Sequence, residues 1–448
     1  MDSSAEFRQA SWGFCLLSGK TGKILASFNE NKSLVPASVQ KVVTTSAALH
    51  LLGDTFRFKT QVLYSGSIEK GILKGDLIMK GFGNPVLGSV KGSQQSTEEV
   101  LNEFVDQVKS EGITSIKGNL IADVSYFEYE PIPVAWTWYD IGNYYAPQIG
   151  ALNIAENQYE LHFKPGKKAG DSTLFVRTNP TINGLKLVNH TITANGGGDQ
   201  TFIPGPPRSL EKHIYGKMPI AESFKVKGAI PQPELYLIQS LKKALEKAGI
   251  QQTGKLTVSY SQLATNNSKL LHTHYSKPLS QICQYANYTS NNLAAECILR
   301  TIGAEKGKEG STAEGLLKVQ EFIKTRCGNA NGLKQVDGSG LSKNNLMTPA
   351  QLARYLLEIR KEAWSTCFIG TLPTSGMNGT LESFCEGIST KGKVFAKSGS
   401  MERIKCYAGY VRDKSGTLNA FAIFVNNHDV PNKQIVNKIE GLMELCVE

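Results

Sequence analysis

The first candidate for chemistry is a serine followed three residues later by a lysine, Ser38 and Lys41. On a helix this spacing puts both side chains on one face, one turn apart. A lysine amine beside a serine hydroxyl can take up its proton and so create a nucleophile. The same spacing also begins at Ser67, Ser209 and Ser240, and a serine at a helix start is more often an N-cap.

Local context separates Ser38 from the other three copies. Only this serine opens an apolar helix, expected within residues 34–53, LVPASVQKVVTTSAALHLLG. Apolar residues recur there at helical spacing, Pro36 precedes the start and Gly53 marks the end. The other copies fall in a turn, after a proline-rich run and inside an amphipathic helix. We therefore expect Ser38 to be the nucleophile.

Two later polar segments could complete such a site. Residues 288–292, YTSNN, end one predicted helix and begin the next, and they bring a hydroxyl at Ser290 and an amide at Asn292. Residues 396–400, AKSGS, end a predicted strand, where Lys397 could meet a carboxylate. The alternatives are an N-cap for the helix at 292–304 and an ordinary strand end with a glycine turn. A Lys-Thr-Gly phrase at residues 20–22 falls in a predicted hairpin turn, and we discard it.

Asp140 lies among aromatic side chains in the segment VAWTWYDIGNYYAPQIGALNIAEN, residues 134–157. Clustered aromatics most often form a core. A carboxylate among them either accepts hydrogen bonds that tie its loop or binds a cation. Both readings stay open for Asp140.

The elements that must position these residues lie near the two ends of the chain. Strands are expected within 11–28 and at 393–398, 404–412 and 418–427, and helices at 278–287, 292–304, 311–326, 349–361 and 431–446. The middle is mainly β-like, with helices at 96–111 and 233–248 and an echo of KGDLI in KGNLI. We interpret this pattern as one catalytic domain made of both chain ends and interrupted by a long insertion. The alternative is two unrelated domains in series.

Composition is that of an ordinary globular protein with two or three domains. The 448 residues are 40% hydrophobic and 20% charged, and the net charge of +10 favours anionic surroundings such as a cell-wall polymer or lipid headgroups. No basic helix or arm gathers that charge, which disfavours nucleic acid. A solvated basic surface is the simplest explanation.

Compartment and cofactor use follow from what the sequence lacks. No apolar run approaches the roughly 20 residues that span a bilayer, and the first residues have no apolar signal-peptide core. We expect either a cytosolic protein or one whose export signal is missing from this sequence. The eight cysteines show neither Cys-x-x-Cys nor metal-ligand spacing, so we expect mainly core residues, with one or two disulfides open if the chain is exported. We expect no metal and no cofactor.

The sequence thus contains three motifs in order: Ser38-x-x-Lys41, Ser290-x-Asn292 and Lys397-Ser-Gly399. Together they resemble the motif set of penicillin-binding proteins and serine β-lactamases. The wide gap after the first motif is similar to the class C low-molecular-mass penicillin-binding proteins, the D-alanyl-D-alanine carboxypeptidase family (peptidase S13, DacB-like) that also includes endopeptidases. Further phrases resemble that family: PASVQK, KGDLIMKGFGNP, WTWYDIGNYYAP, VDGSGLSKNNLMTP, LPTSGMNGTL and GYVRDKSGTLNAFAIFVNN. Two positions depart from its usual pattern, Ser-Asn-Asn for Ser-Asp-Asn and Lys-Ser-Gly for Lys-Thr-Gly. Both are mild changes that leave the required groups in place.

The resemblance implies an α/β (α+β) fold, in which an antiparallel sheet flanked by helices forms a transpeptidase-like domain with two mainly β insertion domains. The catalytic domain is expected at 1–60 and 264–448. One insertion domain is expected at 61–95 with 166–263, and the other at 96–165.

The resemblance also implies a serine-type D-Ala-D-Ala carboxypeptidase, with endopeptidase action as a further activity and an acyl-enzyme on Ser38. Lys41 would be the base, its pKa lowered by repulsion from Lys397 and by desolvation. Ser290 would relay the proton to the leaving amine, and Asn292 would hold the peptide amide.

Substrate recognition is implied in the same way. Ser398 and Ser400 would receive the terminal carboxylate beside Lys397, and Gly399 would let the backbone approach the ligand closely. The N–H groups of Ser38 and Ser400 would form the oxyanion hole. Asp140 would bind the free amine of the stem peptide's diamino acid.

The implied partners are peptidoglycan stem peptides ending in D-Ala-D-Ala, with β-lactams as covalent inhibitors. The implied location is periplasmic or extracytoplasmic, with no nucleic acid and at most peripheral membrane association. Two rival functions remain, a serine β-lactamase and a non-catalytic β-lactam-sensing or wall-binding protein. Nothing here resembles the Glu-containing loop of class A β-lactamases.

Overall fold

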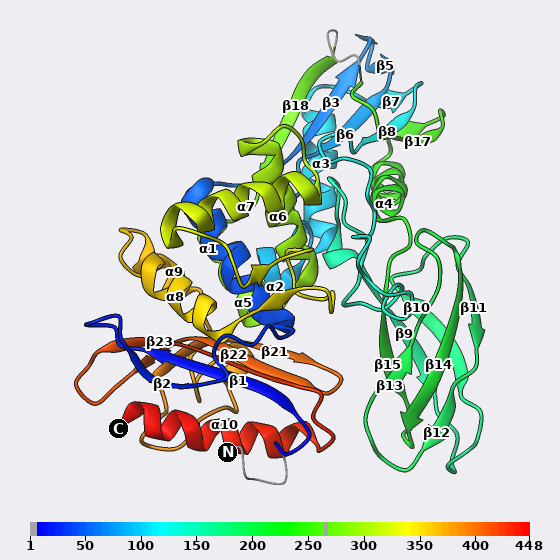
Figure 1. Ribbon diagram of the computed structural model, residues 1–448. Coiled ribbons are helices and arrows are strands. Elements are labelled where there is room, and N and C mark those ends of the chain that lie inside the picture. The colour runs from blue at the N-terminus through cyan, green and yellow to red at the C-terminus, as the bar shows by residue number, and fades with distance from the viewer. Residues whose placement is uncertain (1–6, 264–267) are drawn as a thin grey trace. The chain divides into compact units, whose positions relative to one another are not determined.

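The computed structural model describes residues 7–263 and 268–448 and divides into two compact units (Figure 1). The first unit combines Met1–Phe56 with Pro278–Glu448, and the second is Arg57–Lys277. Where the chain returns to the first unit, the Leu279 N–H donates to the Phe56 carbonyl at 2.7 Å. The first unit is therefore built from both ends of the chain.

The first unit is organised around an antiparallel sheet of five strands in the order β2-β1-β23-β22-β21. Its strands are β1 (Ser11–Leu17), β2 (Ile24–Phe28), β21 (Val394–Met401), β22 (Ile404–Arg412) and β23 (Leu418–Asn426). β1 pairs with β23 from Ser11 opposite Asn426 to Leu17 opposite Ala420. Because these strands lie on either side of the insertion in sequence, the sheet itself joins the two chain ends.

Helices cover both faces of this sheet, which explains why β22 and β23 are apolar almost without alternation. The helices are α1 (Lys41–Leu51), α5 (Leu279–Tyr288), α6 (Asn292–Lys306), α7 (Thr312–Cys327), α8 (Pro349–Ile359), α9 (Ser365–Gly370) and α10 (Asn432–Val447). On one face α10 packs Ile435, Ile439 and Met443 into a core with sheet residues (Figure 1). On the other face α8 packs on β1 and β23, and α1 contacts α6, α5 and α7.

The second unit is mainly β, with four sheets and the helices α2 (Val90–Ser93), α3 (Thr97–Ser110) and α4 (Pro233–Lys247). One sheet has the order β17-β8-β6-β3-β18 and a second has the order β16-β7-β5-β4. Their strands are β3 (Lys59–Ser65), β4 (Ser67–Glu69), β5 (Ile72–Lys74), β6 (Leu77–Gly81), β7 (Ser115–Ile116), β8 (Leu120–Asp123), β16 (Gln251–Gln252), β17 (Leu256–Ser259) and β18 (Ser268–Tyr275). The echoed phrases KGDLI and KGNLI lead into β6 and β8, which pair in parallel with Leu77 opposite Leu120.

The other two sheets of this unit have the orders β10-β9-β15 and β11-β14-β12, with β13 also paired to β14. Their strands are β9 (Gln158–Lys164), β10 (Leu174–Asn179), β11 (Lys186–Asn189), β12 (Ile192–Ala194), β13 (Gln200–Phe202), β14 (Glu211–Pro219) and β15 (Phe224–Ala229). A shared core includes Leu161, Ile214 and Met218. The expected fold class is thus confirmed, while the division of the insertion into 61–95 with 166–263 and 96–165 stays a prediction.

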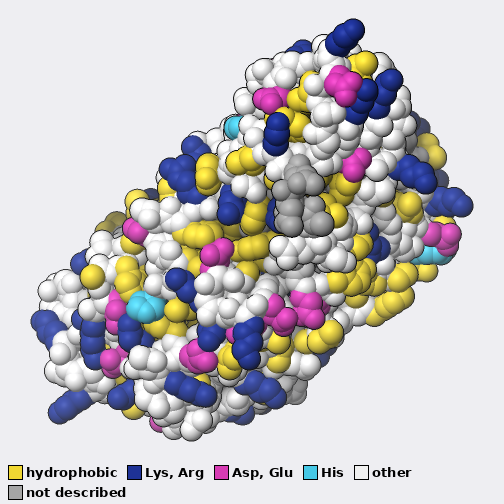
Figure 2. All heavy atoms as spheres, turned by 90° about the horizontal axis from the view of Figure 1, so that it is seen from above, with side chains coloured by type: hydrophobic (Ala, Val, Ile, Leu, Met, Phe, Trp, Pro, Cys, Tyr) yellow, Lys and Arg dark blue, Asp and Glu magenta, His cyan; other side chains and the backbone are white. Residues whose placement is uncertain are grey.

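Charge and cysteine placement complete the description. Figure 2 shows a face on which Lys and Arg side chains are spread among acidic and uncharged ones. All eight cysteines fall in the described ranges and are thiols, six of them buried. Within residues 7–263 and 268–448, no helix is both long and apolar enough to cross a bilayer.

Candidate active site

Ser38 lies in a 3-10 turn, η1 (Ala37–Gln40), and the α-helix α1 begins only at Lys41. The expectation that Ser38 opens the α-helix is therefore wrong by one turn. Ala37, just before the serine, has a φ of +49°, which a non-glycine residue rarely adopts. Such conformations persist where surrounding structure imposes them, and hydrophobic periodicity cannot reveal them.

The Lys41 amine has three neighbours at hydrogen-bonding distance. Its Nζ lies 3.0 Å from Ser38 Oγ, 2.6 Å from Asn292 Oδ1 and 2.7 Å from the Ser339 carbonyl oxygen. The Lys41 side chain is fully buried. The structure therefore brings the first motif and Asn292 together, although α1 and α6 flank the whole insertion in sequence.

Burial lowers the pKa of Lys41 to about 7, whereas the nearby carboxyl groups of Asp337 and Glu296 act in the opposite direction. The sequence-based account, in which Lys397 lowers the Lys41 pKa, needs correction because Lys397 is not among these causes. The pKa of Lys397 is itself held far below its ordinary value, first by burial and then by Lys41 and Lys405. Desolvation is the main reason that the Lys41 amine can be neutral near neutral pH.

The second motif occupies the connection between α5 and α6. Asn291, and not Asn292, caps α6 by accepting from the Ala294 N–H at 2.8 Å. This leaves Asn292 as the first helical residue, with its amide oxygen at Lys41. Ser290 lies half-buried in the preceding turn with a φ of +56°.

The third motif lies inside β21, which runs to Met401 and does not end at residue 398 as expected. Residues 373–375 cover part of its outer edge, where the Ala396 N–H donates to the Pro373 carbonyl at 3.0 Å. N–H groups of one strand point to the same edge at every second residue. Those of Ser398 and Ser400 therefore point to the edge beyond this cover.

Gly399 places this part of β21 directly against Ser38. A Cβ on Gly399 would lie 2.6 Å from the Pro36 carbonyl oxygen and 3.1 Å from Ser38 N. Only a residue without a side chain allows this approach. Lys397 is buried and donates to the Ser398 carbonyl at 2.7 Å, whereas Ser400 is exposed.

A short turn, η4 (Gly379–Leu381), connects the second and third motifs. The Ser398 hydroxyl donates to Thr380 Oγ1 at 2.8 Å. A Cβ on Gly379 would lie 3.1 Å from Tyr288 Cα, at the end of α5. The sequence predicts no role for this segment, LPTSGMNGTL, and Thr380 is not among the predicted site residues.

Asp140 belongs to the second unit, where both carboxylate oxygens have partners in its own loop. Thr137 Oγ1 donates to Oδ2 at 2.6 Å, and the Tyr145 hydroxyl donates to Oδ1 at 3.3 Å. This agrees with the alternative in which Asp140 ties its loop. Recognition of an amine by Asp140 stays a prediction.

A buried loop that accepts a hydrogen bond from Lys41 was not predicted from the sequence as part of the site. Glu296 on α6 and Asp337 in the segment VDGSGLS are both fully buried, and Ser339 supplies the carbonyl that accepts from Lys41. Glu296 follows Asn292 by four residues, so helical spacing alone places both on one face. That spacing is the one signal from which the sequence could have predicted a role for Glu296.

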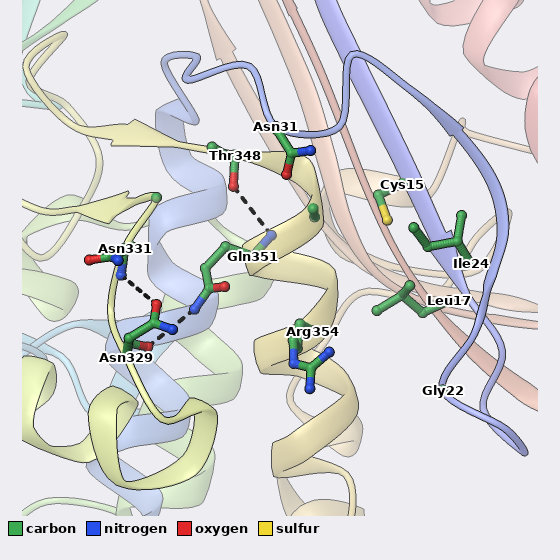
Figure 3. Close-up of a pocket in the computed structure, with 12 residues that line it drawn as sticks. Cys15, Leu17, Gly22, Ile24, Asn31, Asn329, Asn331, Thr348, Gln351 and Arg354 are labelled. Atoms are coloured by element: carbon green, nitrogen blue, oxygen red, sulfur yellow. Dashed lines mark hydrogen bonds between the residues drawn. The ribbon is translucent and has the colours of Figure 1, made fainter.

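A cavity elsewhere in the first unit contains none of these residues (Figure 3). It has a volume of about 430 Å³ and lies by β1, β2 and α8, where its lining includes Ile24, Asn329, Gln351 and Arg354. Within the described residues, no cluster of three or more His, Cys, Asp or Glu side chains is arranged to hold a metal. The candidate active site is thus defined by motif geometry and not by cavity size.

With this geometry in hand, the sheet flanked by helices and the three converging motifs are those of a serine penicillin-binding protein. The chain belongs to the D-Ala-D-Ala carboxypeptidase 3 (S13) family, whose model matches residues 2–445. It is accordingly a serine-type D-Ala-D-Ala carboxypeptidase.

Two curated relatives and one solved structure illustrate the likeness. The D-alanyl-D-alanine carboxypeptidase of Actinomadura sp. (strain R39) is 28% identical over 94% of this chain and 78% of the relative. The D-alanyl-D-alanine carboxypeptidase DacB of Haemophilus influenzae is 26% identical over 96% of this chain and 88% of the relative. The crystal structure of penicillin binding protein 4 (dacB) from Haemophilus influenzae matches with a TM-score of 0.85 at 23% identity, covering 98% of this chain and 97% of that one.

Proposed function

We propose that this carboxypeptidase cleaves peptidoglycan stem peptides through an acyl-enzyme on Ser38. The observation that carries the proposal is the approach of the buried Lys41 amine to within 3.0 Å of Ser38 Oγ. Ser38 Oγ attacks the carbonyl carbon of the D-Ala-D-Ala bond while its proton passes to Lys41 Nζ. The carbon–nitrogen bond then breaks, and Ser290 relays the proton to the departing D-Ala amine. Water hydrolyses the ester and regenerates Ser38.

Charge that develops on the carbonyl oxygen needs donors at the right place. We assign this role to the N–H groups of Ser38 and Ser400, and removing one such donor typically costs about 3 kcal/mol in the barrier. The support is that the Ser400 N–H points to the outer edge of β21, and that Gly399 packs against Ser38 N.

Recognition of the substrate's end is assigned to β21 and α6. Lys397 with the hydroxyls of Ser398 and Ser400 would receive the terminal carboxylate, and an anion beside Lys397 would raise its depressed pKa. Asn292 would hold the peptide amide as well as the Lys41 amine. β-Lactams would acylate the same serine, in line with a solved structure of the Haemophilus influenzae protein complexed with a β-lactam. A substrate of this kind implies an extracytoplasmic, periplasmic location.

One experiment separates this proposal from its rivals. The protein is incubated with labelled penicillin, with a D-Ala-D-Ala peptide and with a cross-linked peptide dimer. A slow covalent adduct with D-Ala release supports the carboxypeptidase, and cleavage of the dimer adds endopeptidase action. Rapid drug turnover would instead support a β-lactamase, and an adduct without peptide cleavage would support a sensor.

For Asp140 we propose contact with the free amine of the stem peptide's diamino acid. The test compares Asp140→Ala on two peptides that differ only in that amine. A larger loss of kcat/KM for the amine-bearing peptide supports recognition. Equal losses on both would argue that Asp140 only ties its loop to Thr137 and Tyr145.

A further inference from the structure

A neutral lysine amine has two N–H donors and one lone pair, and only the lone pair can take a proton from serine. The Lys41 amine faces two oxygen acceptors other than the serine, Asn292 Oδ1 at 2.6 Å and the Ser339 carbonyl at 2.7 Å. If both N–H groups are given to these oxygens, the lone pair is left for Ser38 Oγ at 3.0 Å. Correct placement of the Ser339 carbonyl is therefore a requirement of the chemistry.

That carbonyl belongs to a buried loop that contacts η1, where Ser38 lies, and the start of α1. Three successive carbonyls of the loop accept hydrogen bonds from one side. Gln40 Nε2 donates to the Asp337 carbonyl at 2.9 Å, and Thr44 Oγ1 donates to the Gly338 carbonyl at 2.7 Å. Lys41 is the third donor, so the loop makes one continuous set of contacts with η1 and α1.

On its other side the loop is held by the carboxylate of Glu296, which contacts the N–H groups of residues 338 and 339. The Glu296 carboxylate accepts from the Gly338 N–H at 3.0 Å and from the Ser339 N–H at 2.8 Å. A Cβ on Gly338 would lie 2.9 Å from the Ala295 carbonyl oxygen, so the loop lies directly on α6. A buried carboxylate with two N–H donors is a strong and directional contact.

We propose that Glu296 is a positioning residue for the acylation step: it fixes the Gly338–Ser339 peptide on α6 and thereby aims the Lys41 lone pair at Ser38. Helix α6 then positions the Lys41 amine in two ways. Asn292 contacts the amine directly, and Glu296, one turn later, holds the loop that contacts it. This inference rests on the proposed role of Lys41 as the base. Glu296 itself touches neither Ser38 nor substrate.

The charges around the base determine how its titration responds. Glu296 on α6 and Asp337 in the loop both raise the pKa of Lys41 against the effect of burial. Burial and the charge of Asp337 raise the pKa of Glu296 to about 7, while its hydrogen bonds from the loop and the buried Arg300, one turn further on, act against this rise. On β21, the charge of the buried Lys397 and that of Lys41 repel each other. Glu296 carries its negative charge mainly above about pH 7. Removing that charge should lower the Lys41 pKa and move the acid limb of the acylation rate to lower pH.

The test measures the second-order rate constant for acylation by labelled penicillin across pH 5–9 in three variants. In Glu296→Gln one of the two loop N–H groups faces an amide donor, so that hydrogen bond is lost. Misplacement of a reacting group by about 1 Å costs about 100-fold in rate. We expect the plateau value of its acylation rate constant to fall by about tenfold to about 100-fold. We also expect the midpoint, the pH at which the rate constant is half its plateau value, to lie below that of the unmodified protein. Glu296→Asp keeps the charge but shortens the reach, so its rate should fall while its midpoint stays.

The matched control is Thr44→Val, which removes a neutral contact to the same loop. It should lower the rate without moving the midpoint. A Glu296→Gln protein with unchanged rate and midpoint would overturn the inference, as would an equal midpoint shift in Thr44→Val. If Glu296→Gln does not fold, Glu296→Asp decides alone, and a rate equal to that of the unmodified protein contradicts the positioning role. Absence of any adduct in the unmodified protein would overturn the proposed function as well, which distinguishes the two failures.

Discussion

At the scale of single residues, Lys41 depends most on its surroundings. An exposed lysine is almost fully protonated at neutral pH and cannot act as a base. Full burial beside Asn292 and the Ser339 carbonyl lets the same amine lose its proton near neutral pH. Desolvation therefore suits Lys41 to the proposed role of base, at a position where two carboxyl groups limit how far its pKa falls.

This environment predicts the pH dependence of acylation. Lys41 must be neutral to accept the Ser38 proton, and its pKa is about 7. Below that pH the amine is protonated, so the rate constant for acylation should fall about tenfold per pH unit. Rate constants measured with labelled penicillin should rise between pH 5 and pH 8 and then level off. A rate that is constant across pH 5–8 would contradict the assignment of Lys41 as the base.

The residue types of the site could be predicted from the sequence, because spacing on a helix and the order of three motifs restrict them. The electrostatic environment that sets the Lys41 pKa could not be predicted in this way. Glu296 and Asp337 act on Lys41 through space from another helix and a loop, and their burial depends on tertiary packing. The same holds for Thr380, whose contact with Ser398 requires η4 to lie beside β21.

At the scale of elements, the turn η1, which carries Ser38, is held between two glycine-dependent contacts. A Cβ on Gly399 would meet Pro36 and Ser38 from the side of β21. A Cβ on Gly340 would lie 2.0 Å from the Ala37 carbonyl oxygen. These two contacts explain why the chain adopts a 3-10 turn with a strained Ala37 where hydrophobic periodicity predicts a regular α-helix start.

Substitution of Gly340 tests this arrangement, with Gly416 as a control. Both glycines have nearly the same left-handed φ, +81° and +82°, but a Cβ on Gly416 meets nothing within 4 Å. Gly340→Ala and Gly416→Ala should each cost about 1–2 kcal/mol of unfolding free energy for the backbone. Gly340→Ala should cost a further 1–3 kcal/mol, roughly, for overpacking and should slow acylation, as measured by denaturant unfolding and penicillin labelling. Equal effects of the two changes on both measurements would show that close packing on η1 is unimportant.

Most helices and strands of the first unit could be predicted from hydrophobic periodicity, since long amphipathic segments show their period clearly. The length of β21 could not, because the polar phrase KSGS looks like the end of a strand. It continues as strand to Met401 because each residue from Val394 onward is paired with β22. Backbone pairing here overrides the side-chain pattern.

At the scale of the whole molecule, the first unit is assembled from chain segments that the second unit separates. Its sheet pairs β1 with β23, and its site pairs Lys41 with Asn292, a separation of 251 residues. Contacts of such high sequence separation are expected to form late and slowly in folding. The insertion leaves and returns at nearly one point, since Ser280 N–H donates to the Asp54 carbonyl at 3.0 Å.

This closeness of exit and return predicts that the second unit can be removed. A variant in which a short Gly-Ser linker replaces residues 57–277 should fold, because the sheet and its helices lie within the remaining chain. It should show one cooperative unfolding transition in circular dichroism and form a penicillin adduct. A soluble variant without cooperative unfolding would contradict the view that the first unit holds its own core.

The central claim, that Ser38 is the acylated nucleophile, is tested most directly by locating the adduct. The protein is incubated with penicillin, digested and mapped by mass spectrometry, together with the variants Ser38→Ala and Ser67→Ala. Ser67 begins another Ser-x-x-Lys copy, in β4 of the second unit, and is the matched control. We predict one adduct on the peptide that contains Ser38, its loss in Ser38→Ala and its retention in Ser67→Ala. An adduct on any other residue, or one that persists in Ser38→Ala, would contradict the account.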